Sequence, residues 1–528
     1  MPATLNLRLT WCALFCSAAL LLVPGYIQAQ CSSTPGLSKL YQTGWGIDFK
    51  GQRFALDTTI NGGNAADLKL KWAYGFGTKT PRVFPLVSED TIFIGDANVG
   101  LVALDRDSGC TRWVNEAVTD PSTAISHGVI DGRTVLVIAG RQSGVFAVDA
   151  ISGATIWQRH VNDDNPVPVF SGSPLVFEEQ VFVPLSSMEI GLSANPFYGC
   201  CTTSGAVASL DLRTGQTNWY RRTIPDQPKV TGRHYLFVEE YGPSGAPVWG
   251  APTLDVERRL LYFGTGQNYS HPTTATSDAI FAVDIDSGEP RWIAQFTEND
   301  AFNMACAAGG VNCPDPMGPD VDFGAPPILV TLPDGRDAVL AGQKSGDIWA
   351  INPDDGTTIW HTRIGRGGAL GGIHWGMAVD QENATLFVPI SDLPALPGKD
   401  EAEPGMFALD IATGKNRWSS PRVQRCEGRQ CWSGLSAGIT VADGVIVAGA
   451  LDGLLEIYDS VSGALIWSYD TQVEFDTVNG VAAKGGAIDA HGPVLAGNLL
   501  IAVSGYGSFG QKPGNALLVF ELPEEASP

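Results

Sequence analysis

One phrase recurs seven times along the chain and constrains the fold more than any other feature. A typical copy consists of a short apolar strand, an Asp, two or three residues, Ser-Gly or Thr-Gly, three more residues and a Trp, as in LVALDRDSGCTRW and MFALDIATGKNRW. This pattern indicates two antiparallel strands joined by a tight turn. The Asp side chain caps such a turn, and the Gly takes its positive-φ position.

The tryptophans that end these phrases set the number of repeats. Intervals of about 40 to 70 residues between them suit four-stranded propeller blades with insertions, whereas a β-helix needs shorter rungs. Another Trp, in LKLKWAYGF, has no turn phrase of its own. Together they predict an all-β, eight-bladed β-propeller in which each indole packs between blades. The eight residues are Trp72, Trp113, Trp157, Trp219, Trp292, Trp360, Trp418 and Trp467.

The two ends of the chain each carry an incomplete repeat. The strand around Trp72 has no partner hairpin, and the last strand, ALLVFEL, is followed by no Trp. If both strands share one blade, the ring closes and no sheet edge stays open. We therefore expect one propeller domain over residues 30–528, although length alone favours about three domains of roughly 150 residues.

Residues 1–29 have the features of a secretory signal. Arg8 precedes an apolar stretch at 13–23, and Ala29 is a small residue suited to cleavage. An uncleaved membrane anchor is the alternative. With the signal removed, no remaining stretch has the length of a membrane span, so we expect a periplasmic or secreted protein. The formal net charge of −23 argues against nucleic acid as a partner and favours basic ones.

Eight of the ten cysteines lie beyond the signal. An even number in an oxidising compartment predicts four disulfides. Three pairs close short loops, which leaves Cys31 and Cys110 for each other; alternatively, the adjacent cysteines bond to separate partners. No C-x-x-C-H motif is present, so no c-type haem is expected. The three local pairs are Cys200–Cys201, Cys306–Cys313 and Cys426–Cys431.

The longest intervals between repeat tryptophans direct the search for a site to residues 160–350, because loops on a rigid scaffold carry function. The motifs YGCCTTSGAV, GTGQNYS and DVDFGAPPIL lie there, and GWGIDFKGQRFA precedes the first repeat. With the repeats and the adjacent cysteines, they resemble the quinoprotein alcohol dehydrogenases, and within that family the polyvinyl-alcohol dehydrogenases. The resemblance covers essentially the whole mature chain. It implies an eight-bladed propeller that binds pyrroloquinoline quinone (PQQ) and a metal ion on the ring axis.

The resemblance implies a set of metal ligands. Glu189, in SSMEIGLSA, occupies the place of the family's metal-binding glutamate, and carboxylate oxygens suit a hard divalent cation. The family's asparagine ligand falls on Gln267, with Asn268 one step later, so either amide is a candidate. Asp320 and Asp322, in PDVDFGAPPIL, complete the expected set. An Asp at the second of these places occurs in lanthanide-using members, so either Ca²⁺ or a lanthanide is expected.

The family's general base is an aspartate in a Trp-Asp-Tyr-type motif. DAFNM resembles that motif but carries Asn303, and an amide cannot accept the alcohol proton. Asp320 lies 24 residues before Lys344, close to the family's separation between base and cation. We therefore interpret residues 303–319 as an insertion, Asp320 as the base and Lys344 as the cation on the quinone oxygens. The alternative is an ordinary acidic turn.

The resemblance also implies the quinone contacts. Trp249 lies outside the repeats, where family members stack an indole on the quinone. A disulfide between Cys200 and Cys201 would press on the opposite face, although the family usually places this pair one blade earlier. Ser171 matches a hydroxyl that hydrogen-bonds the quinone.

Three further positions are expected to contact the cofactor, and two of them depart from the family. His127 stands where the family has Arg, and His374 precedes Trp375 where the family often has Asn. Histidine holds a carboxylate less firmly than the arginine fork does.

Two functions are consistent with these patterns. The first is a PQQ- and metal-dependent alcohol dehydrogenase that oxidises the secondary hydroxyls of small-molecule or polymeric alcohols and passes electrons to a separate acceptor such as a soluble cytochrome c. The second is a non-catalytic exported scaffold. The scaffold explains the repeats and the signal but not the site motifs in family order.

Overall fold

The computed structural model describes Cys31 and residues 34–161, 165–235, 237–392, 402–425 and 432–523. The expected signal at 1–29 and the expected pair Cys426–Cys431 lie outside the described residues, and the division into a signal and one domain stays a prediction. In the described part of the chain, no helix has the length and apolarity needed to cross a membrane.

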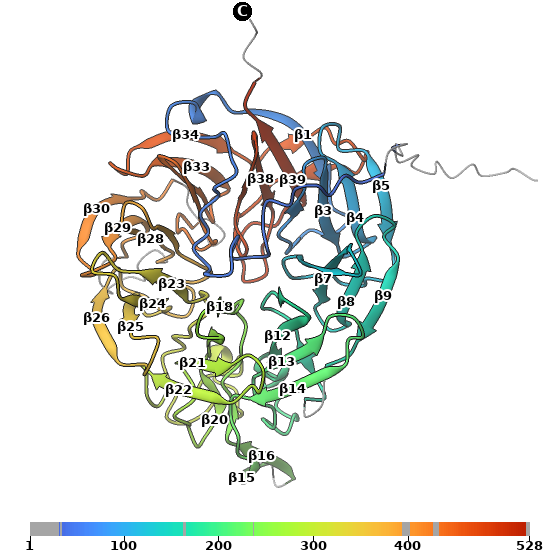
Figure 1. Ribbon diagram of the computed structural model, residues 1–528. Coiled ribbons are helices and arrows are strands. Elements are labelled where there is room, and N and C mark those ends of the chain that lie inside the picture. The colour runs from blue at the N-terminus through green and yellow to red at the C-terminus, as the bar shows by residue number, and fades with distance from the viewer. Residues whose placement is uncertain are drawn as a thin grey trace, which may run out of the picture.

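Eight antiparallel sheets stand around a central axis, as predicted (Figure 1). Their middle strands are buried on both faces, because each sheet is covered by its two neighbours; this explains the continuous apolar runs of the repeats. Blade 1 contains β2 (Leu86–Val87), β3 (Thr91–Asp96), β4 (Gly100–Asp105) and β5 (Thr111–Asn115), and blade 2 contains β6 (Ser126–Ile130), β7 (Arg133–Gly140), β8 (Gly144–Asp149) and β9 (Thr155–Arg159). Blade 3 contains β10 (Pro168–Val169), β11 (Leu175–Phe177), β12 (Gln180–Ser187), β13 (Ala206–Asp211) and β14 (Thr217–Arg222). Blade 4 contains β18 (Thr253–Asp255), β19 (Leu260–Gly264), β21 (Ala279–Asp284) and β22 (Pro290–Gln295).

The second half of the ring repeats the same order. Blade 5 contains β23 (Ile328–Thr331), β24 (Asp337–Gly342), β25 (Asp347–Ile351) and β26 (Thr358–Arg363), and blade 6 contains β27 (Ala378–Asp380), β28 (Thr385–Ile390), β29 (Gly405–Asp410) and β30 (Asn416–Pro421). Blade 7 contains β31 (Thr440–Ala442), β32 (Val445–Gly449), β33 (Leu454–Asp459) and β34 (Leu465–Asp470). Blade 8 contains β37 (Val494–Ala496), β38 (Leu499–Ser504), β39 (Ala516–Glu521) and β1 (Lys69–Gly75). In blade 8 the first strand of the chain pairs antiparallel with the last, which confirms the predicted closure.

The repeat tryptophans join neighbouring blades, as predicted. In seven cases the indole lies against the turn glycine of the next blade; Trp219, for example, covers Gly288 and donates from Nε1 to the Ile285 carbonyl at 2.8 Å. The turn Asp holds the same turn from within, since Asp284 Oδ1 accepts from the Ser287 amide at 3.0 Å. Trp467 faces blade 8, which has no such turn, and packs edge-on against Phe520 instead.

The segment before β1 covers part of the axis. Its backbone carbonyls accept hydrogen bonds from the first strands of four successive blades: Phe49 from Leu254, Lys50 from Leu329, Gln52 from Val379 and Arg53 from Val441. This explains the position of the GWGIDFKGQRFA motif. The Arg53 guanidinium is fully buried and donates to the carbonyls of Trp45, Ile439 and His491.

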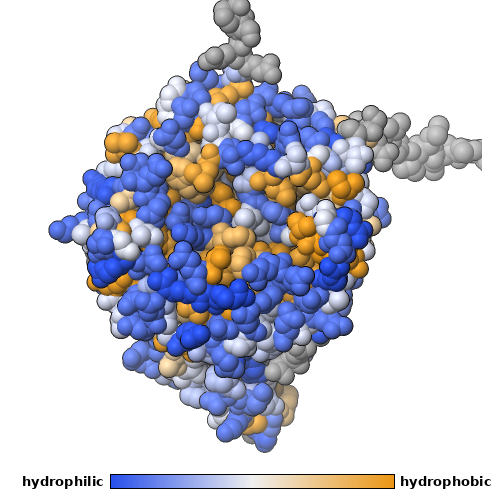
Figure 2. Space-filling model, viewed as in Figure 1, coloured by the Kyte–Doolittle hydropathy of each residue, from blue (hydrophilic) through white to orange (hydrophobic). Residues whose placement is uncertain are grey.

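The remaining short elements lie mostly between blades 3 and 5, where the long intervals predicted insertions. They are η1 (Ala65–Asp67), α1 (Glu189–Leu192), β15 (Lys229–His234), β16 (Val238–Gly242), β17 (Ser244–Gly245), β20 (Asn268–Ser270), η2 (Cys306–Ala308), β35 (Glu474–Phe475) and β36 (Ala483–Lys484). The β15–β16 hairpin projects from the rim of the ring (Figure 1). In the same view, apolar side chains gather toward the middle of the ring on a largely hydrophilic face (Figure 2).

Candidate functional site

A small cavity near the axis collects side chains from several blades. It measures about 10 Å³ and is lined by Trp249, Trp375, Ser171 and His491, among others. Trp249 lies so close to Gly324 that no Cβ fits at that position. The two indoles meet edge to face, with 5.2 Å between ring centroids. The cavity therefore joins residues that are far apart in the sequence, and Trp249, Trp375 and Ser171 were all predicted site residues.

Next to Trp249 lies a buried ionic group. Lys344 Nζ is 2.8 Å from Asp320 Oδ1 and 3.5 Å from Asp322 Oδ2. The second oxygen, Asp320 Oδ2, accepts from no residue in the described ranges. Trp249 Nε1 donates to Asp322 Oδ2 at 2.9 Å, and the backbone N–H of Gln267 donates to Asp322 Oδ1 at 3.1 Å. The structure thus brings together the expected base, the expected cation and the expected stacking indole.

Burial and charge act in opposite directions on this group. Burial raises the pKa of Asp320, the Lys344 ammonium lowers it, and the result is a pKa of about 6. Burial by itself disfavours the charged form of Lys344, but the carboxylates of Asp320 and Asp322 raise its pKa above the ordinary value. Near neutral pH, Asp320 is therefore ionised yet basic enough to accept a proton.

Sequence reasoning missed the residue that positions Asp320. The carboxylate of Asp300 accepts from the backbone amides of Asp320 and Val321 at 3.1 and 2.9 Å. It holds the turn in which Asp320 adopts a φ of 58°. Asp278, whose buried carboxylate has no hydrogen-bond partner in the described structure, was also missed. Asp300 is the first residue of the DAFNM motif, in which only Asn303 was weighed as the base, whereas Asp278 belongs to no quoted motif.

The insertion at 303–319 is held by its own contacts. Asn303 Nδ2 donates to the carbonyls of Tyr269 and Asn312, and its Oδ1 accepts from Ala305. A disulfide joins Cys306 to Cys313, as predicted. Both polar side-chain atoms of Asn303 thus have structural partners.

Glu189 begins α1 and is fully buried. Its carboxylate accepts from the backbone amides and hydroxyls of Thr202 and Thr203 and from the Tyr198 hydroxyl, at 2.6–3.1 Å. Five donors therefore satisfy this carboxylate. In this arrangement it anchors the loop that carries the adjacent cysteines, and its role as a metal ligand stays a prediction.

Cys200 and Cys201 form the predicted disulfide, and Cys31 pairs with Cys110. The adjacent pair is buried beside Tyr269. Trp249 belongs to a different cluster, with Trp375 and Tyr506. The two groups are not in direct contact, and the position of the disulfide opposite the Trp249 indole, across a bound quinone, stays a prediction.

The two histidines differ in their relation to the cavity. His374 is buried beside Trp249, with 5.6 Å between ring centroids, and its Nδ1 pairs with Ser436 Oγ at 2.7 Å. Burial lowers its pKa to about 3, so it is neutral. His127 lies in β6, does not line the axial cavity, and contacts the Gln42 carbonyl at 3.1 Å.

Three buried nitrogens near the axis have no hydrogen-bond partner among the described residues: Trp375 Nε1, His491 Nδ1 and Arg82 Nε. Buried polar groups normally find partners, so this concentration indicates a ligand rich in acceptors. PQQ, with quinone carbonyls and carboxylates, fits this donor set.

The donor set fits a metal less well. Within the described ranges, no group of three or more His, Cys, Asp and Glu side chains is arranged to hold a metal ion. Asn268 Oδ1 already accepts from the Thr274 amide at 2.9 Å, and Lys344 lies against both Asp320 and Asp322. The side-chain oxygens of Glu189, Asn268 and Asp322 therefore have protein partners, whereas Asp320 Oδ2 has none among the described residues.

Comparison with known proteins identifies the family. The family model described as "Glucose/ethanol/alcohol dehydrogenase, beta-propeller domain", a PQQ family, matches residues 43–313, and that of "Outer membrane protein assembly factor BamB" matches residues 405–516. A polyvinylalcohol dehydrogenase of Sphingopyxis sp. is 33% identical and covers 92% of this chain and 76% of its own length. One from Pseudomonas sp. is 32% identical over 91% of this chain and 76% of its own.

Solved structures agree on the fold. A quinohemoprotein alcohol dehydrogenase of Pseudomonas putida superposes with a TM-score of 0.69 at 17% identity, over 92% of this chain and 81% of its own. The alternative of a non-catalytic scaffold is not favoured by these relatives. The chain therefore belongs to the PQQ-dependent quinoprotein alcohol dehydrogenases, as its motifs indicated, and is similar within that family to the polyvinyl alcohol dehydrogenases.

Proposed function

We propose that this quinoprotein oxidises secondary alcohols, including the hydroxyls of a polymer such as polyvinyl alcohol, to ketones. The names of the two relatives that are 32% and 33% identical support the substrate class. The observation that carries the chemistry is the Asp320–Lys344 pair, buried beside Trp249. It offers an ionised carboxylate oxygen without a described partner, held next to an indole surface.

Bound PQQ supplies the oxidised quinone that takes up the hydride from the substrate's carbinol carbon. Asp320 accepts the hydroxyl proton at Oδ2, the oxygen that Lys344 does not hold. Lys344 keeps the carboxylate oriented through Oδ1 and balances its charge in a site that is nearly closed to water. Asp322 fixes the Trp249 indole through Nε1 and so positions the aromatic surface relative to the base.

We place this chemistry in the periplasm or outside the cell, on the basis of the expected signal at residues 1–29. Electrons then leave to a separate acceptor. The net charge of −23 favours a basic partner such as a soluble cytochrome c, because opposite charges steer the encounter and raise its rate. A metal requirement, for Ca²⁺ or a lanthanide, is part of the proposal through the family and not through the described contacts.

A titration of purified apoprotein tests the function. PQQ is added alone, with Ca²⁺ and with a lanthanide, and dye reduction is followed with a secondary alcohol and with polyvinyl alcohol. We expect PQQ-dependent turnover, and Asp320→Asn should lower kcat by about 10²–10⁴-fold while retaining PQQ binding. Absence of PQQ binding under every condition contradicts the proposed function. Full activity of Asp320→Asn contradicts the assignment of the base.

A further inference from the structure

Exposed apolar side chains gather in the insertions between blades 3 and 5. Among the described residues, three of the four well-exposed Phe and Tyr side chains and both well-exposed Met side chains lie between positions 197 and 317. Single apolar side chains are normal on a protein surface, whereas a group of them marks a binding surface. We call this group the apolar track; it comprises Phe197, Val230, Tyr235, Phe237, Met304, Val311 and Met317.

The connections between strands place the apolar track on the face of the ring that carries the expected base. In an antiparallel blade, the link from the second to the third strand and the link to the next blade leave from the same end. Phe197 lies in such a link between β12 and β13, and Tyr235 lies between β14 and β18. Met317 and Asp320 lie between β22 and β23, and Lys344 lies between β24 and β25. The apolar track and the Asp320–Lys344 pair are therefore on the same side of the molecule.

The outer part of the apolar track consists of the projecting hairpin β15–β16 (Figure 1) and the loop after α1. The Phe197 and Tyr235 rings lie 5.8 Å apart, measured between their centroids. His234 Nε2 hydrogen-bonds the Pro196 carbonyl at 2.8 Å and so fixes the hairpin to this loop. The hairpin therefore presents an aromatic surface that is supported by the ring.

The insertion at 303–319 continues the apolar track inward. Asn312 Nδ2 donates to the Asn195 and Tyr198 carbonyls at 3.0 and 3.1 Å. Val311 directly precedes Asn312, and Phe197 lies between the two accepting residues along the chain. The apolar side chains of the two segments therefore belong to one surface.

Met317 connects the apolar track with the base. The preceding Pro316 carbonyl accepts from His271 Nε2 at 3.0 Å, and the His271 carbonyl lies against Gly242 at the end of β16. Met317 precedes Asp320 by three residues, so their Cα atoms are at most about 11 Å apart. The apolar track therefore extends from the hairpin to the neighbourhood of Asp320.

The segments of the apolar track carry almost no net charge. Across residues 229–242, Lys229 and Arg233 balance Glu239 and Glu240. Residues 195–201 have no charged side chain, and Asp315 is the only one in 303–319. A basic protein that is attracted by the net charge of −23 therefore finds no concentration of negative charge here. An uncharged partner fits this surface better.

We propose that the apolar track binds a neutral polymer whose saturated carbon chain carries hydroxyl groups, as in polyvinyl alcohol, and holds it while one hydroxyl reaches Asp320. The inference rests on the proposed function and extends it by a binding surface outside the catalytic site. The methylene groups of the polymer pack on the aromatic and Met side chains, and its other hydroxyls stay hydrated. A small secondary alcohol is too short to span the apolar track, so only a polymer gains affinity from it.

A double variant separates polymer binding from catalysis. Phe197→Ser combined with Tyr235→Ser should raise the KM of the PQQ-loaded enzyme for polyvinyl alcohol about tenfold, because two apolar contacts are lost. The values of KM and kcat for isopropyl alcohol should equal those of the wild type. Val461→Ser is the matched control, because Val461 is also well exposed but lies in a repeat turn on the other face of the ring. Its kinetics should be unchanged with both substrates.

Polymer binding is also measured without turnover, by native electrophoresis of the full chain through gels that contain polyvinyl alcohol, with and without PQQ. The polymer should retard the wild type and Val461→Ser, and it should retard the double variant much less. Equal retardation and equal KM for the polymer in all three proteins overturn the inference, while oxidation of isopropyl alcohol still supports the proposed function.

Two other occupants of the apolar track give different results. If the double variant loses only the reduction of a basic cytochrome c, the surface docks the electron acceptor and the inference is overturned. If it loses only self-association in sedimentation, the surface joins two copies of the chain and the inference is overturned as well. A wild type that is retarded by the polymer but oxidises no alcohol with PQQ supports the polymer surface and contradicts the proposed function.

Discussion

At the scale of single residues, the chemistry depends on the balance between burial and Lys344 at Asp320. Burial raises the pKa of this carboxyl and Lys344 lowers it, giving a value of about 6. A base acts in its ionised form, which predominates above that pKa. We therefore expect kcat/KM to be level above about pH 7 and to fall about tenfold per unit below about pH 5. A pH profile of the PQQ-loaded enzyme measures this limb directly.

Replacement of Lys344 separates its role from that of the base. Lys344→Gln removes the charge that lowers the pKa of Asp320, so the pKa rises and the acidic limb moves to higher pH. Lys415→Gln, at an exposed turn, is the control for a general change of charge. If the acidic limb of the kcat/KM profile lies at the same pH in Lys344→Gln as in the wild type, a group other than Asp320 is the base.

Glu189 offers a second test at this scale, because two roles predict different outcomes. As a loop anchor with five donors, it should stabilise the fold in the absence of any metal. Glu189→Gln, measured in EDTA, should then lower the free energy of unfolding by about 2–4 kcal/mol. If Glu189 instead serves only a metal, the variant in EDTA matches the wild type and only the stabilisation by added Ca²⁺ disappears.

At the scale of elements, the repeats show why so much of the fold was predictable. The residues of each turn determine its conformation locally. In the turn of blade 4, for example, Asp284 caps the turn, Gly288 has a φ of 69°, and Trp219 covers the turn from the previous blade. These contacts recur at short range, so seven phrases were enough to predict eight blades and the closing strand. Disulfides with short loops were predictable for the same reason.

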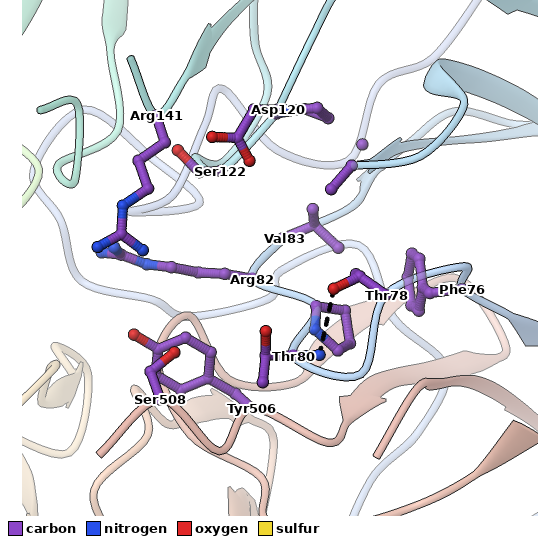
Figure 3. Close-up of a pocket in the computed structure, with 14 residues that line it drawn as sticks. Phe76, Thr78, Thr80, Arg82, Val83, Asp120, Ser122, Arg141, Tyr506 and Ser508 are labelled. Carbon is purple, nitrogen blue, oxygen red and sulfur yellow. Dashed lines mark hydrogen bonds between the residues drawn. The ribbon is translucent and has the colours of Figure 1, made fainter. Parts of the chain in front are cut away.

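The site was predictable only in part, because its residues meet through the ring and not through the sequence. Asp320 and Lys344 were predicted as site residues from the family resemblance. They contact each other because the turns that carry them lie side by side. Arg82 and Arg141, which line one cavity (Figure 3), and His491, which lines the axial cavity, come from loops with no motif, and the ring brings these loops together. The partners of Glu189 lie in the YGCCTTSGAV motif after α1, which the sequence analysis connected with the disulfide and not with Glu189.

The tryptophan contact yields a prediction with an internal control. A Cβ at Gly288 would lie 2.7 Å from the Trp219 ring, whereas a Cβ at Gly335 has open space around it; both have positive φ, 69° and 85°. Gly335→Ala should therefore cost only the backbone strain, about 1 kcal/mol. Gly288→Ala should cost about 1–3 kcal/mol more, because the indole must shift. Urea unfolding of both variants measures the difference, and equal midpoints contradict the docking role of Trp219.

At the scale of the whole molecule, the ring is held shut by one strand supplied from the other end of the chain. β1 pairs with β39 on one side, and on the other Trp72 lies against Gly109 and donates to the Arg106 carbonyl at 3.2 Å. The chain does not continue from β39 into β1, so blade 8 lacks the covalent turn that the other outer strands have. Its stability depends on these non-covalent contacts alone.

Closure can be tested by comparing two tryptophans with the same local contacts. Trp72→Ala and Trp219→Ala each remove an indole from a turn glycine and should each cost about 3–5 kcal/mol. Only Trp72→Ala loosens the closing strand, so hydrogen exchange should rise in β39 at Ala516–Glu521 and in β1, while Trp219→Ala leaves both protected. Equal exchange in β39 for both variants means that blade 8 is closed by strand pairing and that Trp72 adds nothing beyond its own blade contact.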